Sequence, residues 1–133
     1  MKDKFFLDSN IVLYLFDIEP IKKSVAINLI RQKPVISTQV IIETLNISIR
    51  KLKLSKELSF KNAEYLMTVC NLILIEKDIL IKSFDIARKY KFSHLDSLII
   101  ASAIEGNCNI LYSEDLQHKQ KIENKLQIIN PFI

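Results

Sequence analysis

Glycine is nearly absent from this sequence of 133 residues, and Gly106 is the only one. A P-loop or a GxGxxG dinucleotide loop needs at least two glycines, so neither motif is present. The chain has two cysteines (Cys70 and Cys108) and two histidines (His94 and His118). These are too few and too scattered for a CxxC pair or a zinc-finger spacing. Any catalytic chemistry must therefore depend mainly on carboxylates and hydroxyls.

Long apolar runs are also missing. No run approaches the roughly 18 residues of a membrane-spanning helix, and the N-terminal segment MKDKFFLDSN lacks the apolar stretch of a signal peptide. The two cysteines are interpreted as small buried hydrophobes, and so low a cysteine content favours a reducing compartment. These features predict a cytoplasmic protein that does not contact a membrane.

The composition is that of one folded domain spanning residues 1–133. Hydrophobic residues make up 49% of the chain and charged residues 26%, which is ordinary for a globular protein. Lysine and arginine total 19 against 15 aspartates and glutamates, for a formal net charge of +4. A basic exterior is compatible with a nucleic-acid partner, but this net charge alone is weak evidence for one.

Short apolar runs alternate with helical patterns along the chain. The runs are typical of strands covered on both faces, and they are Lys4–Leu7, Pro34–Ser37, Leu72–Ile75, Ile110–Tyr112 and Gln127–Ile129. We expect helices in each interval, including one between the last two strands. Apolar stripes support three of them: Ile41/Leu45/Ile49/Leu52, Ala63/Leu66/Met67/Cys70 and Leu80/Phe84/Ala87. This order predicts an α/β fold with a mainly parallel central sheet of about five short strands flanked by helices.

Four carboxylates follow predicted strands or lie near predicted helix starts: Asp8, Glu43, Asp96 and Asp115. Asp8 has an ordinary explanation as a helix cap, and Asp115 as an acid that favours a helix dipole. Glu43 alone is most simply an exposed helix glutamate. Together, however, all four fall just past strands or at helix starts, where one crevice beyond the carboxyl ends of the strands could collect them.

Asp96 is the most informative of these acids. In the segment LDSLIIASAI, residues 95–104, only Asp96, Ser97 and Ser102 are polar, and a helix that is apolar on every side is buried. Ser93 is expected to cap this helix, with Asp96 in the capping-box position. A buried carboxylate without a partner is strongly unfavourable, so we expect Asp96 also to face a ligand.

Three or four carboxylates within about 4–6 Å of one another repel unless a cation neutralises them. Ligands that are all oxygen select Mg²⁺ or Mn²⁺ rather than zinc. Such an ion suits phosphate groups and makes a bound water easier to deprotonate. The carboxylates therefore predict metal-dependent hydrolysis of a nucleic-acid backbone.

Four segments resemble the PIN-domain ribonucleases, especially the VapC-type toxins of type II toxin–antitoxin pairs. They are LDSNIVLYLF, ISTQVIIETLN, FSHLDSLIIASAIEGNCNILYSEDLQH and IINPFI, and they cover nearly the whole chain in order. The resemblance implies a Mg²⁺- or Mn²⁺-dependent endoribonuclease whose acids are Asp8, Glu43, Asp96 and Asp115. It also matches Asn10 to the polar residue after the first aspartate, and Ser113 to the serine or threonine that assists the site.

The same resemblance implies partners. Similar proteins act on RNA, form homodimers and are inhibited by a cognate antitoxin whose C-terminal segment fills the groove. Two assignments near the site stay open at this point. Glu114 adjoins Asp115, and the motif alignment favours Asp115 as the acid that faces the metal. His118 is interpreted as a surface histidine, with a contact to substrate as the alternative.

Other functions fit parts of the pattern. A PIN-like RNA-binding module without cleavage would not need all four acids. A receiver-like phosphoacceptor domain needs paired acids near the first strand and a lysine after a late strand, but Asp3 precedes the strand and no lysine follows Gln127–Ile129. A phosphoaspartyl hydrolase needs Asp-x-Asp, where this chain has Asp8-Ser9-Asn10. We therefore favour the endoribonuclease.

Overall fold

Short strands and helices alternate along the chain, as the apolar runs predict. A computed structural model describes residues 3–133, so the first two residues of the expected 1–133 domain lie outside the described residues. The elements are β1 (Phe5–Leu7), α1 (Ser9–Val12), a 3₁₀ helix η1 (Leu13–Phe16), α2 (Pro20–Ile30), β2 (Val35–Ser37), α3 (Thr38–Arg50), α4 (Lys56–Val69), β3 (Asn71–Ile73), α5 (Lys77–Tyr90), α6 (His94–Glu105), β4 (Ile110–Tyr112), β5 (Lys121–Ile122) and β6 (Leu126–Ile129).

The strands form one sheet of six strands in the order β3-β2-β1-β4-β6-β5. All neighbouring pairs are parallel except β5 and β6, which are antiparallel. This arrangement confirms the predicted α/β class with a mainly parallel sheet. The chain adds β2 and β3 on one side of β1 and β4 and β6 on the other, so the strand order reverses between β1 and β4. In this register Leu7 pairs with Tyr112, which places the residues after both strands side by side.

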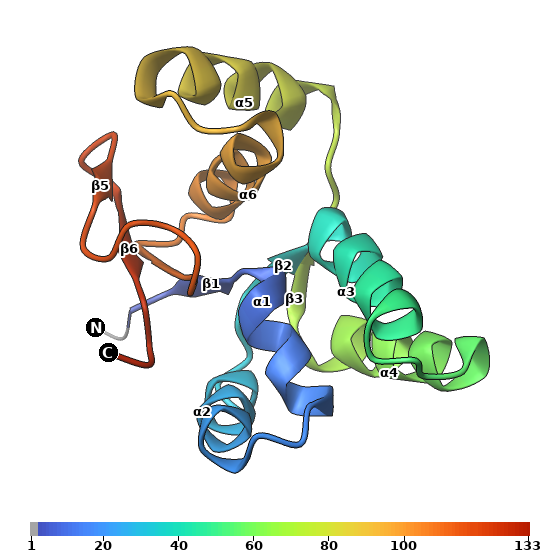
Figure 1. Cartoon of the computed structure of the whole chain (residues 1–133). Coiled ribbons are helices and arrows are strands. Elements are labelled where there is room, and N and C mark those ends of the chain that lie inside the picture. Colours follow the sequence, from blue (N-terminus) through green and yellow to red (C-terminus); the bar gives the residue numbers. More distant parts are fainter. Residues whose placement is uncertain (1–2) are drawn as a thin grey trace.

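The sheet is the centre of the hydrophobic core. Every residue of β1 and β2 is buried, and Phe6, Ile36 and Leu111 have no exposed surface. Burying one such side chain contributes about 1.5–3 kcal/mol. In Figure 1, α5 and α6 lie above the strands, α1 and α2 below them, and α3 and α4 to the right. In the described part of the chain, no helix combines the length and apolar character required to cross a membrane.

The segment between β4 and β6 differs from expectation, because no helix forms there. Residues 114–116 form bends, and the short strand β5 then pairs with β6 as a hairpin. Glu123 and Asn124, the first two of the three connecting residues, both have positive φ, of 54° and 53°. Type I′ hairpin turns require this backbone, and their twist matches that of the flanking strands. Ser113 therefore follows strand β4 directly and does not begin a helix.

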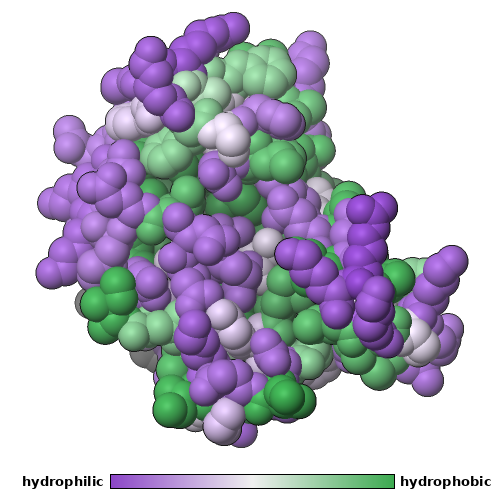
Figure 2. Space-filling model, in the orientation of Figure 1, coloured by the Kyte–Doolittle hydropathy of each residue, from purple (hydrophilic) through white to green (hydrophobic). Residues whose placement is uncertain are grey.

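Helix α5 has apolar residues on two faces, and the predicted stripe is not the buried one. Ile79, Ser83 and Ile86 are buried, whereas Leu80 and Phe84 are 40% and 48% exposed. Packing of α5 against α6 selects the first face and leaves the predicted stripe at the surface. Figure 2 shows hydrophobic surface in patches among hydrophilic residues on one face of the molecule.

Candidate active site at the reversal point of the sheet

A cavity of about 450 Å³ lies where the strand order reverses. All four predicted acids line it, each from a different element: Asp8 follows β1, Glu43 is in α3, Asp96 is in the first turn of α6, and Asp115 follows β4. The remaining lining residues are Ser9, Asn10, Leu13, Asn46, Ile47, Ser93, Leu95 and Ile99. The carboxyl ends of strands at such a reversal are where open α/β sheets bind ligands.

Asp8 is the buried acid of the cavity, with 7% of its surface exposed. It caps α1: one carboxylate oxygen accepts from the Ser9 backbone N–H at 2.7 Å, and the other accepts from the Ser113 hydroxyl at 2.9 Å. The pKa of Asp8 is raised from 3.8 to about 6, mainly by burial and also by the charges of Glu43 and Asp96, which together outweigh the lowering effect of the two hydrogen bonds. The helix-cap interpretation and the site interpretation are therefore both compatible with its position.

Two neighbouring side chains hold the Glu43 carboxylate at the cavity by hydrogen bonds. The Ser9 hydroxyl donates to one of its oxygens at 2.9 Å, and the Gln39 amide donates to the other at 3.1 Å. The same amide group also donates to the Leu95 carbonyl at 3.0 Å and so joins α3 to α6. Sequence reasoning missed both Ser9 and Gln39. The spacing held a signal for Gln39, because residues four apart share a helix face.

Asp96 lies in the first turn of α6, and the Ser93 hydroxyl accepts its backbone N–H at 3.1 Å. This confirms Ser93 as the N-cap. Among the described residues, the Asp96 carboxylate has no hydrogen-bond donor from the protein. Residues 99–103 of α6 are buried, but its first turn opens onto the cavity, where Leu95 is 49% exposed. The Asp96 carboxylate is therefore half-buried rather than enclosed in the core.

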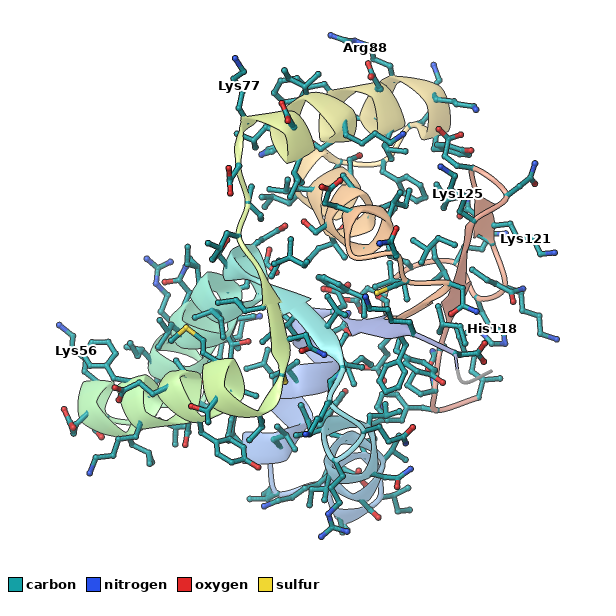
Figure 3. The ribbon with its side chains drawn as sticks, turned by 180° about the vertical axis from the view of Figure 1, so that it is seen from behind. Lys56, Lys77, Arg88, His118, Lys121 and Lys125 are labelled. Atoms are coloured by element: carbon teal, nitrogen blue, oxygen red, sulfur yellow. The ribbon has the colours of Figure 1, made fainter. Side chains whose placement is uncertain are left out.

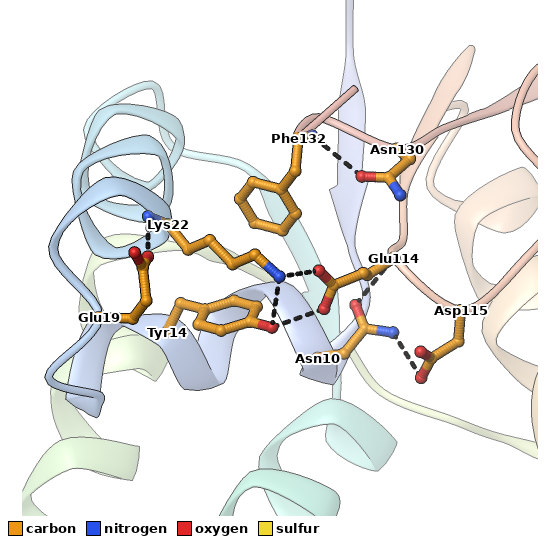
Figure 4. Close-up of polar contacts among 8 residues, drawn as sticks. All are labelled: Asn10, Tyr14, Glu19, Lys22, Glu114, Asp115, Asn130 and Phe132. Atoms are coloured by element: carbon orange, nitrogen blue, oxygen red, sulfur yellow. Dashed lines mark hydrogen bonds and ion pairs between the residues drawn. The ribbon is translucent and has the colours of Figure 1, made fainter.

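Asp115, not Glu114, is the acid of this segment that lines the cavity. The Asn10 amide donates to an Asp115 carboxylate oxygen at 3.1 Å and to the Ser113 hydroxyl at 3.4 Å. Glu114 points the other way, toward Tyr14 and Lys22 (Figure 4). His118 is not among the lining residues, and its Nδ1 accepts the Asn130 backbone N–H at 2.9 Å. This contact favours the surface interpretation of His118.

The donor set of the cavity fits a hard divalent cation, since four carboxylates surround one space. The charges of Glu43 and Asp96 that disfavour ionised Asp8 would be offset by such an ion. Within residues 3–133, no three Asp, Glu, His or Cys side chains converge into a finished metal centre. The chemistry of the residues therefore matches Mg²⁺ or Mn²⁺, and ligation would require their side chains to draw closer.

Fold and site together define an α/β protein with an acidic cleft at the reversal point of a parallel sheet. The family model described as PIN domain matches residues 5–123. The chain therefore belongs to the PIN domain family, and this confirms the resemblance seen in its motifs. No curated protein matches the sequence at a significant level.

Solved structures share the fold over nearly the whole chain. A toxin–antitoxin complex from Klebsiella pneumoniae is 19% identical with a TM-score of 0.72, covering 96% of this chain and 98% of that one. The VapBC-1 structure from nontypeable Haemophilus influenzae is 22% identical with a TM-score of 0.71, covering 97% and 98%. VapC20 from Mycobacterium tuberculosis, described as a sarcin–ricin loop cleaving toxin, is 18% identical with a TM-score of 0.69, covering 84% and 90%.

Proposed function

We propose that this protein is a Mg²⁺- or Mn²⁺-dependent endoribonuclease that serves as the toxin of a toxin–antitoxin pair. One observation carries the proposal: four acids from four separate elements line one cavity at the reversal point of a PIN-family sheet. A role as a helix cap or as a solvated surface residue would explain each acid by itself, but neither role requires all four acids to line the same cavity. Metal-dependent hydrolysis of a phosphodiester accounts for such a cluster, because a cation held by the carboxylates also offsets the negative charge of the phosphate.

Asp8, Asp96 and Asp115 would hold the cation, and Glu43 would complete the site or orient the attacking water. When bound, the cation supplies positive charge for the phosphate and lowers the pKa of water. The chain's own residues prepare the acids for this role. Ser113 and the Ser9 backbone hold Asp8, and Asn10 holds Asp115. Among the described residues, no donor is hydrogen-bonded to the Asp96 carboxylate, so it could bind a cation without first losing a hydrogen bond to the protein.

RNA is the proposed substrate because the exterior is basic around an acidic cavity. Figure 3 shows five cationic side chains directed outward: Lys56 on α4, Lys77 and Arg88 on α5, and Lys121 and Lys125 in the β5–β6 hairpin. Cations spread in this way contact phosphates and give affinity without selecting a sequence. The net charge of +4 already includes the four acids of the cavity, so the remaining surface is more basic than that figure indicates.

An antitoxin and a second copy of the chain are the proposed protein partners. Two neighbours in fold are a VapBC structure and a toxin–antitoxin complex, and the cavity here has apolar walls formed by Leu13, Ile47, Leu95 and Ile99 that suit a partner segment. Exposed Leu80, Ile81 and Phe84 on α5 provide apolar surface for a homodimer. With RNA and an antitoxin as partners, we place its action in the cytoplasm.

Expression in a bacterial host tests the toxin role. Wild-type protein should arrest growth, and the product of a small adjacent open reading frame should relieve the arrest. Asp96→Asn should abolish the arrest, because it removes a carboxylate from the cavity while keeping the side chain's size. Asp85→Asn is the matched control, since Asp85 is an exposed acid on α5 outside the cavity.

Arrest by the wild-type and Asp85→Asn proteins but not by Asp96→Asn would support the proposal. Equal arrest by the wild-type and Asp96→Asn proteins would contradict it and would favour an RNA-binding module without cleavage. Absence of arrest by wild-type protein at comparable expression would contradict the toxin role.

A further inference from the structure

The segment Ser113-Glu114-Asp115 brings an acid to the cavity without regular secondary structure to hold it. Its three side chains have different partners. Ser113 is buried and donates to Asp8. Asp115 is exposed, lines the cavity and accepts from Asn10. Glu114 faces away from the cavity and contacts α2 and η1 (Figure 4).

Glu114 is fixed by two donors. The Tyr14 hydroxyl donates to one carboxylate oxygen at 2.6 Å, and Lys22 Nζ forms an ion pair with the other. Lys22 also donates to the Tyr14 hydroxyl at 3.3 Å. The Lys22 and Glu114 side chains are 35% and 23% exposed, so solvent screens this pair less than it screens a fully exposed one.

Aromatic rings enclose the lysine. Lys22 Nζ lies 5.0 Å from the centroid of the Tyr14 ring and 5.1 Å from that of Phe132. The two rings meet edge to face with centroids 5.3 Å apart. The Asn130 side chain accepts the Phe132 backbone N–H at 2.9 Å and holds the C-terminal end in place. A cation over two aromatic faces is favourable and restricts where the lysine can go.

Asn10 links this arrangement to the cavity. Its carbonyl oxygen accepts the Glu114 backbone N–H at 3.2 Å, while its amide donates to Asp115 at 3.1 Å. The backbone at Glu114 is therefore held by Asn10, and its side chain by Tyr14 and Lys22. Rotation or displacement of residue 114 would move the attachment point of the next residue, Asp115.

We propose that Glu114 is a positioning residue for Asp115. We call Tyr14, Lys22, Glu114 and Phe132 the Glu114 cluster. This cluster holds the backbone of residues 113–115 so that the Asp115 carboxylate lines the cavity, where it would bind a cation. The proposal rests on the proposed function, because it takes Asp115 to be a metal ligand. Residues that orient ligands in this way typically change metal affinity about 10–100-fold when they are lost.

The chain contains a matched control. Glu123 pairs with Lys89 at 2.8 Å and accepts from the Tyr90 hydroxyl at 3.1 Å. A lysine and a tyrosine hydroxyl thus hold Glu123, as Lys22 and Tyr14 hold Glu114; Lys82 lies 3.9 Å from the other carboxylate oxygen, and the Glu123 side chain is similarly exposed at 25%. Glu123 lies in the β5–β6 turn and does not line the cavity. Loss of Glu123 therefore removes similar interactions without acting on Asp115.

The test compares Glu114→Ala, Glu123→Ala and Asp115→Asn with the wild-type protein. Mn²⁺ affinity is measured by calorimetry on the full chain, and kcat and KM for RNA cleavage are measured at one fixed Mn²⁺ concentration. Both alanine variants should lower the Tm by comparable amounts. Only Glu114→Ala should weaken Mn²⁺ binding, by about tenfold or more, and it should lower kcat with little change in KM. Lys22→Arg keeps the positive charge beside Glu114 and should therefore bind Mn²⁺ more tightly than Glu114→Ala does.

Unchanged Mn²⁺ affinity in Glu114→Ala would overturn the proposal, as would equal weakening in Glu123→Ala. The failure of the proposed function has a different signature. In that case the wild-type protein itself would bind no Mn²⁺ and cleave no RNA, or Asp115→Asn would match it in both measurements, and the positioning role would fall with the function.

Discussion

Asp8 shows how a single residue serves the fold and the site together. Its carboxylate caps α1 by accepting from the Ser9 backbone N–H, and it also accepts from the Ser113 hydroxyl. Both contacts stabilise the local structure. Its burial is unfavourable to the charged form and raises its pKa to about 6. A cation bound nearby would favour the ionised carboxylate and lower this pKa.

The raised pKa of Asp8 predicts a pH dependence of folding stability in the metal-free protein. A group whose folded pKa exceeds its unfolded pKa stabilises the folded state when protonated. This contribution is complete below the unfolded value of 3.8 and is lost as the pH rises through about 6. A shift of this size corresponds to about 3 kcal/mol.

Urea unfolding in EDTA, between about pH 4 and pH 7, measures this effect. The free energy of unfolding of the wild-type protein should fall relative to that of Asp8→Asn as the pH rises across this range, because the asparagine does not titrate. A difference between the two proteins that stays constant with pH would show that Asp8 has an ordinary pKa.

At the scale of elements, two kinds of structure present the acids. Helix α6 presents Asp96 from a regular first turn, and the serine, aspartate and apolar pattern that marks this turn is local enough to be predicted from sequence. The segment after β4 presents Asp115 through contacts with Asn10, Tyr14 and Lys22, which lie about a hundred positions away. No local pattern encodes such contacts, and this is why a helix was expected there.

Two helices begin with the same kind of serine cap, and only one of these helices carries a residue of the site. Removing each cap in turn therefore distinguishes the effect of a cap on stability from its effect on the site. Ser93 accepts the Asp96 N–H at 3.1 Å, and Ser55 accepts the Leu58 N–H at 3.1 Å at the start of α4. Alanine at either position should lower the free energy of unfolding by about 1 kcal/mol. Only Ser93→Ala should also slow RNA cleavage, because only that cap fixes the turn that carries Asp96.

Urea unfolding and RNA cleavage rates of the two variants provide the measurement. Equal cleavage by Ser93→Ala and Ser55→Ala would indicate that the α6 cap has no influence on the site. A much larger loss of stability in one variant than in the other would indicate that the caps are not equivalent.

At the scale of the whole molecule, the sheet topology determines the site. Residues 8, 43, 96 and 115 converge because β1 and β4 are neighbours and α3 and α6 begin near the same edge of the sheet. The sequence predicted this convergence, since each acid follows a strand or begins a helix. It did not predict which face of α5 is buried, because Ile79 and Leu80 mark competing faces and only packing against α6 decides between them.

RNA cleavage after removal and return of metal tests the central claim most directly. Purified wild-type and Asp96→Asn proteins are treated with EDTA, dialysed and assayed on labelled single-stranded RNA over increasing Mn²⁺ concentrations. Internal cleavage by the wild-type protein should be absent without metal and return with Mn²⁺, while the Asp96→Asn preparation should stay inactive throughout. Cleavage that persists in EDTA, or that is equal in the two preparations, would contradict a metal-dependent nuclease built on these acids.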